Sequence, residues 1–137
     1  MTFTDLKLTN AFFRDNFIGP KSDRPTVTVM RDGFAEVTLQ TGRQHSRPGN
    51  MVSGPTQMAL ADTVAYVTIF TKLGITPMAV TSSLNVSFLR PCIGPSMRAE
   101  GTLVKLGQTL GVTDVRIFGE GRDAPSAIAT VTYALPK

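Results

Sequence analysis

The chain has 137 residues, of which 42% are hydrophobic and 18% charged, a composition that excludes intrinsic disorder and predicts a folded domain. This length predicts one domain over residues 1–137, with residues 1–25 as an N-terminal helix and linker. The net charge of +4 invites an anionic partner. However, the basic residues are scattered and no nucleic-acid-binding motif appears, so a small anionic ligand is expected rather than nucleic acid.

A short helix is expected over about residues 3–18, where three apolar residues lie at helical spacing, namely Phe13, Phe17 and Ile18. The stretch 26–41 alternates around an Asp-Gly pair and predicts a β-hairpin. A polar loop, 42–50, follows it. The apolar run from about 55 to 73 then predicts a long helix, closed by Lys72 and Gly74.

After the long helix, the pattern is almost continuously that of strands. Four strands are expected, over 78–91, 97–107, 110–121 and 126–136. The order is therefore one helix, two strands, one long helix and four strands. Such segregation favours an α+β fold with an antiparallel sheet over alternating βαβ units.

The long helix is apolar on nearly all sides, which is typical of a helix buried over most of its surface. One sheet can bury such a helix by curling around it, while a second copy of the chain covers the rest. This is the hotdog fold. The same helix nevertheless carries one carboxylate, Asp62, which is costly to bury without partners and so is either satisfied structurally or used in chemistry.

No signal peptide is expected, because the first residues lack a basic stretch followed by an uninterrupted apolar one. The most apolar window, 58–70, contains Asp62 and two threonines, so it is too polar and too short to span a membrane. The single cysteine, Cys92, excludes an internal disulfide and fits a reducing compartment. A cytoplasmic location without membrane contact is expected.

Three stretches carry a family resemblance. The loop and helix start "HSRPGNMVSGPTQMALAD" (45–62) resembles the signature of hotdog-fold acyl-CoA thioesterases of the phenylacetate-pathway (PaaI-like) branch. The strand "AVTSSLNVSFLRP" (79–91) and the hairpin "EGTLVKLGQTL" (100–110) resemble later motifs of the same family. The resemblance covers about residues 30–137.

The resemblance implies roles for individual residues. Asp62 matches the catalytic carboxylate, Gly54 the first glycine of a His-Gly-Gly turn, and Thr81 a strand hydroxyl near the reaction centre. His45 matches the leading histidine. The chain departs from the family at five positions, with Ser53 for the second histidine, Pro55 for the second glycine, Arg47 for the loop asparagine, Ser83 for the strand aspartate and Gln108 for a basic hairpin residue.

The departures leave the main backbone donor in place. The turn aims backbone N–H groups at a thioester carbonyl from a helix N-terminus. Pro55 has no N–H but suits the first helical turn, while Gly54 keeps its own N–H. Ser53 replaces an imidazole by a smaller hydroxyl, so Ser53 and Thr81 are candidate polar helpers, against the alternative that they serve as a helix cap and a strand hydroxyl.

A distance argument predicts an oligomer. Gly54 and Asp62 are eight positions apart, which is about 12 Å along one helix. Because a carbonyl oxygen accepts a hydrogen bond over only about 3 Å, one helix cannot offer both groups to the same thioester. We therefore expect the two groups to come from two protomers of a two-fold dimer, with a tetramer of two dimers left open.

The remaining candidates are weaker. Arg90, Lys105 and Arg47 are candidates to hold the phosphates of CoA, against the alternative of solvated surface charge. Three aromatic residues are candidates for the acyl site, namely Phe13, Phe17 and Tyr66. With one histidine, His45, and no carboxylate cluster, neither a metal site nor a Ser-His-Asp triad is expected, and no cofactor beyond the CoA of the substrate.

The sequence thus predicts an acyl-CoA thioesterase that releases free acid and CoA, with Asp62 as nucleophile or general base. Two alternatives remain. The changes at Ser53, Pro55 and Gln108 suit a non-catalytic hotdog protein that binds acyl-CoA as a sensor or carrier. A hotdog hydratase or dehydratase is a weaker reading, because position 53 lacks the histidine such enzymes use.

Overall fold

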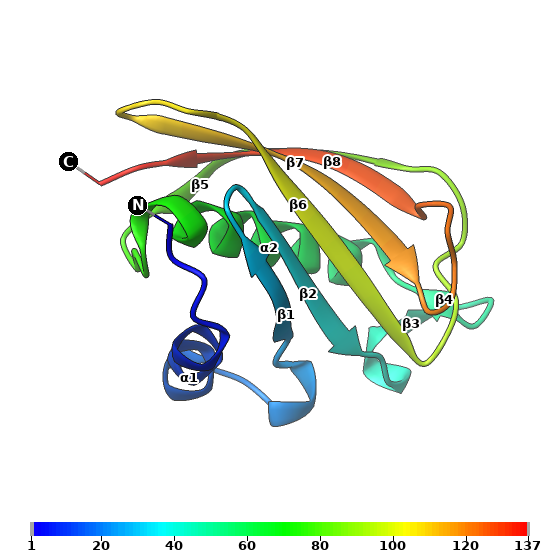
Figure 1. Ribbon diagram of the computed structural model, residues 1–137. Coiled ribbons are helices and arrows are strands. Elements are labelled where there is room, and N and C mark those ends of the chain that lie inside the picture. Colours follow the sequence, from blue (N-terminus) through cyan, green and yellow to red (C-terminus); the bar gives the residue numbers. More distant parts are fainter. Residues whose placement is uncertain (1, 137) are drawn as a thin grey trace.

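The computed structural model describes residues 2–136 and folds as one curved sheet around one long helix (Figure 1). The helices are α1 (Leu6–Asn16) and α2 (Gly54–Leu73). The large sheet contains β1 (Thr26–Arg31), β2 (Phe34–Gln40), β5 (Val80–Phe88), β6 (Ser96–Leu106), β7 (Leu110–Gly119) and β8 (Ala127–Ala134). The predicted α+β hotdog architecture is confirmed.

The six strands lie in the order β1-β2-β6-β7-β8-β5, and every neighbouring pair is antiparallel. Strands β1 and β2 turn at Asp32 and Gly33, as the Asp-Gly pair predicts, and Gly33 takes a φ of 73°. The last strand in sequence, β8, lies between β7 and β5. As a result, β5 forms one edge of the sheet even though it lies in the middle of the chain.

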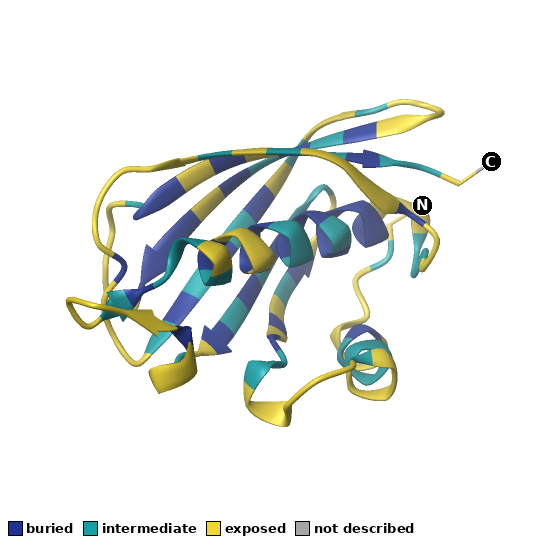
Figure 2. Cartoon of the chain, turned by 180° about the vertical axis from the view of Figure 1, so that it is seen from behind, coloured by how far each residue is buried: buried dark blue, intermediate teal, exposed yellow. Residues whose placement is uncertain are grey.

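Helix α2 runs across the concave face of the sheet. Ser53 caps its start through a hydrogen bond from the Thr56 N–H, and Gly74 ends it with a φ of 80°. Its sheet-facing residues are completely buried, among them Val64, Val67, Ile69 and Phe70. In Figure 2 the helix lies in front of the sheet, and its exposed residues face the viewer in its N-terminal half. The helix thus buries one side in this chain and leaves the other uncovered.

Helix α1 covers the other edge of the sheet. The Asn10 side chain accepts from the Val27 N–H (2.8 Å) and donates to the Val27 carbonyl (2.9 Å), so it pairs with β1 as a strand would. This contact occupies an edge that would otherwise offer unpaired backbone groups. The helix ends before the predicted boundary: Phe17 is its C-terminal cap and Ile18, 97% exposed, lies outside it. Gly19 and Pro20 follow and cannot extend the helical pattern.

The loop predicted over residues 42–50 contains short regular pieces. A 3₁₀ turn, η2 (Arg43–His45), leads into a two-stranded hairpin of β3 (Ser46–Arg47) and β4 (Met51–Val52). A second 3₁₀ turn, η1 (Lys21–Asp23), precedes β1. The hairpin turns through Gly49 and Asn50, both with positive φ. This small hairpin leads directly into the start of α2.

One buried hydroxyl provides a stability test. Thr113 of β7 is buried, and its Oγ1 has no hydrogen-bond partner among residues 2–136. Thr113→Val keeps the shape and removes the unsatisfied group, so it should raise the free energy of unfolding by about 1 kcal/mol. Thermal denaturation would show this as a rise in Tm of about 2–6 °C.

The matched control for this test is Thr71→Val. Thr71 is equally buried, but its hydroxyl accepts from the Gly33 N–H (3.0 Å) and donates to the Thr68 carbonyl (2.7 Å). Losing that acceptor should lower the free energy of unfolding by about 1–3 kcal/mol. Equal destabilisation by both variants would contradict the assignment of Thr113 as unsatisfied.

Candidate active site

The Asp62 carboxylate lies on the uncovered side of α2, near the middle of the helix, and is partly buried. Thr81 of β5 donates from its hydroxyl to Asp62 Oδ1 at 2.5 Å. Tyr133 of β8 donates to the same oxygen at 2.9 Å, and its hydroxyl also lies 3.0 Å from the Asp62 carbonyl oxygen. The second carboxylate oxygen, Oδ2, has no partner within residues 2–136. Two donors therefore fix the carboxylate through one oxygen and leave the other available.

Tyr133 remains a hydrogen-bond donor at any physiological pH. Burial raises the pKa of its phenol well above the usual value, and the neighbouring Asp62 charge raises it further. The ring also stacks on Tyr66, with 5.6 Å between ring centres. A phenol that stays protonated and is held in place by stacking can orient the Asp62 carboxylate by donating a hydrogen bond to it, and it places no second negative charge beside it.

The pairing of β5 with β8 explains how Thr81 reaches Asp62. Thr81 pairs with Tyr133, and Leu84 pairs with Val131. Thr81 and Leu84 are three residues apart, so in a regular strand their side chains would point to opposite faces of the sheet. A register shift between Thr81 and Ser83 marks a β-bulge, which brings the two side chains to the same face of the sheet. The bulge therefore turns Thr81 toward the helix together with Leu84.

The start of α2 contains Gly54, the predicted oxyanion donor. The Gly54 N–H has no hydrogen-bond partner in the described part of the chain. Ser53, its neighbour, is used locally: its Oγ caps the helix and lies 2.9 Å from Thr56 Oγ1. A Cβ built on Gly54 would lie 3.3 Å from the Phe88 ring, so the backbone is closely covered on that side.

Gly54 opens onto a cavity of about 410 Å³, here named the helix-start pocket. It is lined by Arg47, Met51, Val52, Gly54, Gln57, Phe88, Leu89, Arg90, Pro91 and Cys92. Two of the three predicted phosphate contacts, Arg47 and Arg90, thus come together beside Gly54, although Arg90 also donates to the Pro125 carbonyl. Lys105 lies far from them, at the other end of β6 beside the turn into β7.

The floor of the helix-start pocket contains a polar contact that sequence reasoning missed. Gln57 is buried, and its Oε1 accepts from the Ser126 hydroxyl at 2.9 Å. The Ser126 carbonyl accepts the N–H groups of Leu89 and Arg90. Burial raises the pKa of the adjacent Cys92 thiol, which therefore stays protonated. In the sequence, a glutamine within an apolar helix was the available signal for this contact, but its partner, Ser126, lies 69 residues away.

His45 is buried at 6% exposure, although the sequence around it predicts a polar loop. Its Nδ1 accepts from the Gly42 N–H (2.8 Å), so the proton is on Nε2, which donates to Asp23 Oδ1 (2.7 Å). Its carbonyl accepts from the Ser53 N–H at 2.8 Å. His45 thus connects the N-terminal segment to the residue that caps α2.

The three predicted acyl-site aromatics separate into two places. Phe13 packs edge-on against Tyr66, with 6.3 Å between ring centres. Burial raises the pKa of Tyr66, whose hydroxyl donates to the Pro77 carbonyl (3.0 Å). Phe17 instead lines a separate cavity on the side of α2.

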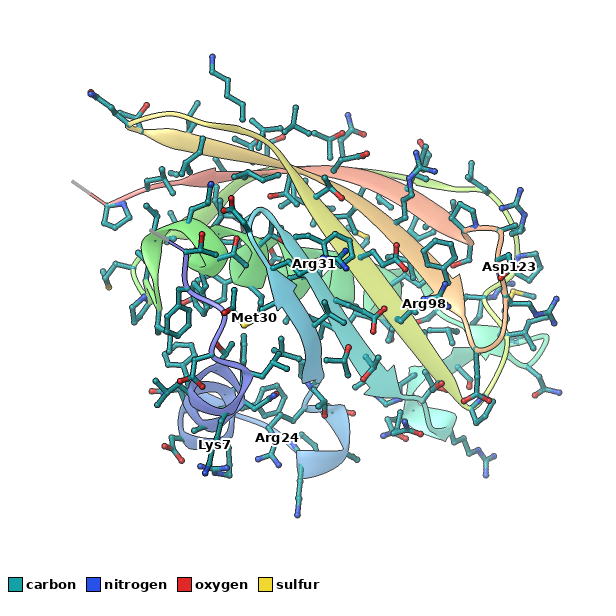
Figure 3. The ribbon with its side chains drawn as sticks, in the orientation of Figure 1. Lys7, Arg24, Met30, Arg31, Arg98 and Asp123 are labelled. Atoms are coloured by element: carbon teal, nitrogen blue, oxygen red, sulfur yellow. The ribbon has the colours of Figure 1, made fainter. Side chains whose placement is uncertain are left out.

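The sheet face opposite α2 carries paired charges. Figure 3 shows Arg31 and Arg98 on that face, where each guanidinium lies 4.1 Å from the centre of a phenylalanine ring. Arg98 also pairs with Glu100, at 3.3 Å between Nε and Oε2. Across residues 2–136, no three histidine, cysteine or acidic side chains gather as a metal site requires, and no helix has the length and apolarity to cross a membrane.

Comparison with known proteins decides the family. The sequence profile of the thioesterase superfamily matches residues 49–126, more than half of the chain. This part includes α2 and every residue that lines the helix-start pocket except Arg47. The chain belongs to the thioesterase superfamily. The predicted enzyme class, a thioester hydrolase, is confirmed.

Solved structures agree with this membership. A crystal structure described as a "putative thioesterase", from Silicibacter sp. TM1040, is 32% identical and superposes with a TM-score of 0.88 over 100% of this chain and 95% of its own. The BH2602 protein of Bacillus halodurans, solved with CoA, is 27% identical, with a TM-score of 0.71 over 81% of this chain and 73% of its own. The PaaI protein of E. coli, from the phenylacetic acid degradation operon, is 23% identical and shares the fold, with a TM-score of 0.80 over 95% of this chain and 93% of its own. The predicted resemblance to hotdog-fold thioesterases is confirmed, and the likeness to PaaI is one of fold.

Proposed function

We propose that this thioester hydrolase is an acyl-CoA thioesterase that converts an acyl- or aryl-CoA to free acid and CoA. The Asp62 carboxylate carries the proposal, because one oxygen is fixed by Thr81 and Tyr133 while Oδ2 has no partner within residues 2–136. Such an oxygen suits a nucleophile that attacks the thioester carbonyl or a base that activates water. The CoA in the similar Bacillus halodurans structure supports this substrate class.

The oxyanion donor in this proposal is the Gly54 N–H of a second protomer. Within one helix the two groups stand about 12 Å apart, too far to share a carbonyl. The N-terminus of α2 concentrates partial positive charge, which favours the oxyanion of a tetrahedral intermediate. Ser53 contributes by capping that helix end and Thr81 by holding Asp62.

The free edge of β5 supports a homodimer as the assembly. This strand pairs only with β8 and exposes large apolar side chains, among them Val80 (58%) and Phe88 (50%). Figure 2 shows the strand as mostly exposed along the upper edge of the sheet. An unprotected apolar edge is a site for pairing with another strand. Antiparallel pairing of two β5 strands would turn the start of each α2 toward the other helix.

The same arrangement would assemble the CoA contacts. Val80 aligns with Ala134 and Leu110, next to the β6–β7 turn, and Lys105 lies beside this turn at the end of β6. Phe88 lies at the opposite end of β5, which leads to Arg90. Two antiparallel copies of β5 bring the Val80 end of one against the Phe88 end of the other. Lys105 of one protomer would then approach Arg90 and Arg47 of its partner and share the phosphates of CoA.

Release of free thiol from a panel of short, medium, long and aromatic acyl-CoAs tests the proposal. We expect the wild type to release thiol from at least one ester. Light scattering should give the mass of a dimer or a larger assembly. Saturable binding of acyl-CoA without any release of thiol would favour the sensor or carrier alternative, to which the changes at Ser53 and Pro55 point. Turnover by a monomer would refute the shared site.

A further inference from the structure

A second cavity lies beside the turn of α2 that carries Asp62. This lateral pocket has a volume of about 290 Å³, and most of its lining is apolar. Its walls include Phe17, Asp23, Pro25, His45, Ala59 and Thr63. On a helix, Ala59 and Thr63 both lie to the same side of Asp62, at about 60° and 100° around the axis. A group attached to a carbonyl at Asp62 therefore reaches the pocket by passing over the small Ala59 side chain.

The N-terminal segment forms the outer wall of the lateral pocket. Phe17 and Pro25 contribute their rings, and Asp23 between them is tied to His45 by the 2.7 Å hydrogen bond. Gln44 adds a second contact to the same carboxylate at 3.3 Å. These bonds hold residues 17–25 against the loop that leads into α2, so the cavity exists before any ligand enters.

The size and charge of the lateral pocket limit its occupant. An apolar cavity of about 150 Å³ accepts a benzene ring, so this one has room for about a ring with a short arm or a chain of similar bulk. Asp23 is the one acidic side chain among the residues that line the pocket, and the His45 ring hydrogen-bonds to it. A carboxylate at the far end of an acyl group would be placed beside this negative charge and away from water, which is costly.

We infer that the lateral pocket holds the acyl group of the substrate, and that Phe17, Asp23 and Ala59 restrict it to uncharged acyl groups of medium bulk. This inference rests on the proposed thioesterase function with Asp62 at the reaction centre. It assigns a specificity role to the N-terminal segment, which lies outside the residues matched by the superfamily profile.

The test compares kcat/KM for acetyl-, hexanoyl-, dodecanoyl- and succinyl-CoA. Ala59→Phe fills the pocket from the exposed face of α2, so the preference for hexanoyl- over acetyl-CoA should fall by at least about tenfold. Phe17→Ala removes the outer wall, so the preference for dodecanoyl- over hexanoyl-CoA should rise by a similar factor, about tenfold. For the wild type, kcat/KM should be lowest for succinyl-CoA, lower than the length of its acyl group alone would give. Asp23→Asn should raise kcat/KM for succinyl-CoA.

Ile18→Ala is the matched control for Phe17→Ala, because Ile18 is the next residue but points into solvent and lines no part of the cavity. Its substrate profile should equal that of the wild type. If Ala59→Phe and Phe17→Ala changed all four esters by the same factor, the acyl group would lie elsewhere and the inference would fail while the thioesterase function stood. If the wild type released thiol from none of the esters, the proposed function itself would fail.

Discussion

Asp62→Asn should abolish thioester hydrolysis while leaving the fold and the assembly unchanged. Asparagine has the same shape, and its carbonyl oxygen can still accept from Thr81 and Tyr133, so the contacts to β5 and β8 survive. The amide can neither attack a thioester nor take a proton from water. Loss of a catalytic base or nucleophile of this kind lowers kcat by about 10²–10⁴-fold. Thiol release with a saturating acyl-CoA measures the effect directly.

Asp32→Asn provides the matched control for this loss. Asp32 lies in the turn between β1 and β2, where it pairs with Lys72 at 2.6 Å, and this contact lowers its pKa. Removing that surface charge should leave kcat unchanged, since an exposed ion pair contributes little and the turn lines neither cavity. A result in which Asp62→Asn kept most of the wild-type kcat would make Asp62 a structural residue and remove the basis of the proposed function.

Much of the fold could be predicted because its signals are local. The Asp-Gly turn, the capping Ser53 and the closing Gly74 set the ends of their elements, and the strands alternate apolar and polar residues. The apolar helix also indicated a sheet curled around it. The boundary of α1 was predicted wrongly because Phe17 and Ile18 continue a helical spacing while the Gly19-Pro20 pair ends the helix.

The site was harder to predict because its contacts join distant parts of the chain. The alternation of β8 predicts that Tyr133 faces the helix. Its role, however, depends on pairing with Thr81, 52 positions earlier, and on the bulge that turns Thr81 toward the helix. His45 reads as a loop residue until Asp23 is placed beside it by the N-terminal segment. Sequence patterns show which face a residue occupies but not which residue from another element it meets.

Gly54→Pro should lower kcat by about 10²–10³-fold, the usual effect of removing one oxyanion donor. Proline fits the first position of a helix, and Ser53 already has the extended backbone (φ −69°, ψ 156°) that a residue before proline adopts. The substitution removes the N–H, and because residue 54 precedes Pro55, any residue with a Cβ at this position is disfavoured in helical backbone, a cost that the Gly54→Ala control shares. Gly54→Ala is its matched control: it adds the same Cβ near the Phe88 ring but keeps the N–H, so its loss should be much smaller.

Mixed dimers of the two defective chains then test whether the site is shared. If Asp62 of one protomer works with Gly54 of the other, a dimer of Asp62→Asn with Gly54→Pro contains one intact site and one site lacking both groups. Such a dimer, isolated by two different affinity tags, should recover about half of the wild-type activity although each parent is nearly inactive. If each site were built within one protomer, no site in the mixed dimer would be intact and its activity would stay at the parental level. Recovery therefore distinguishes a two-fold shared site from two independent ones.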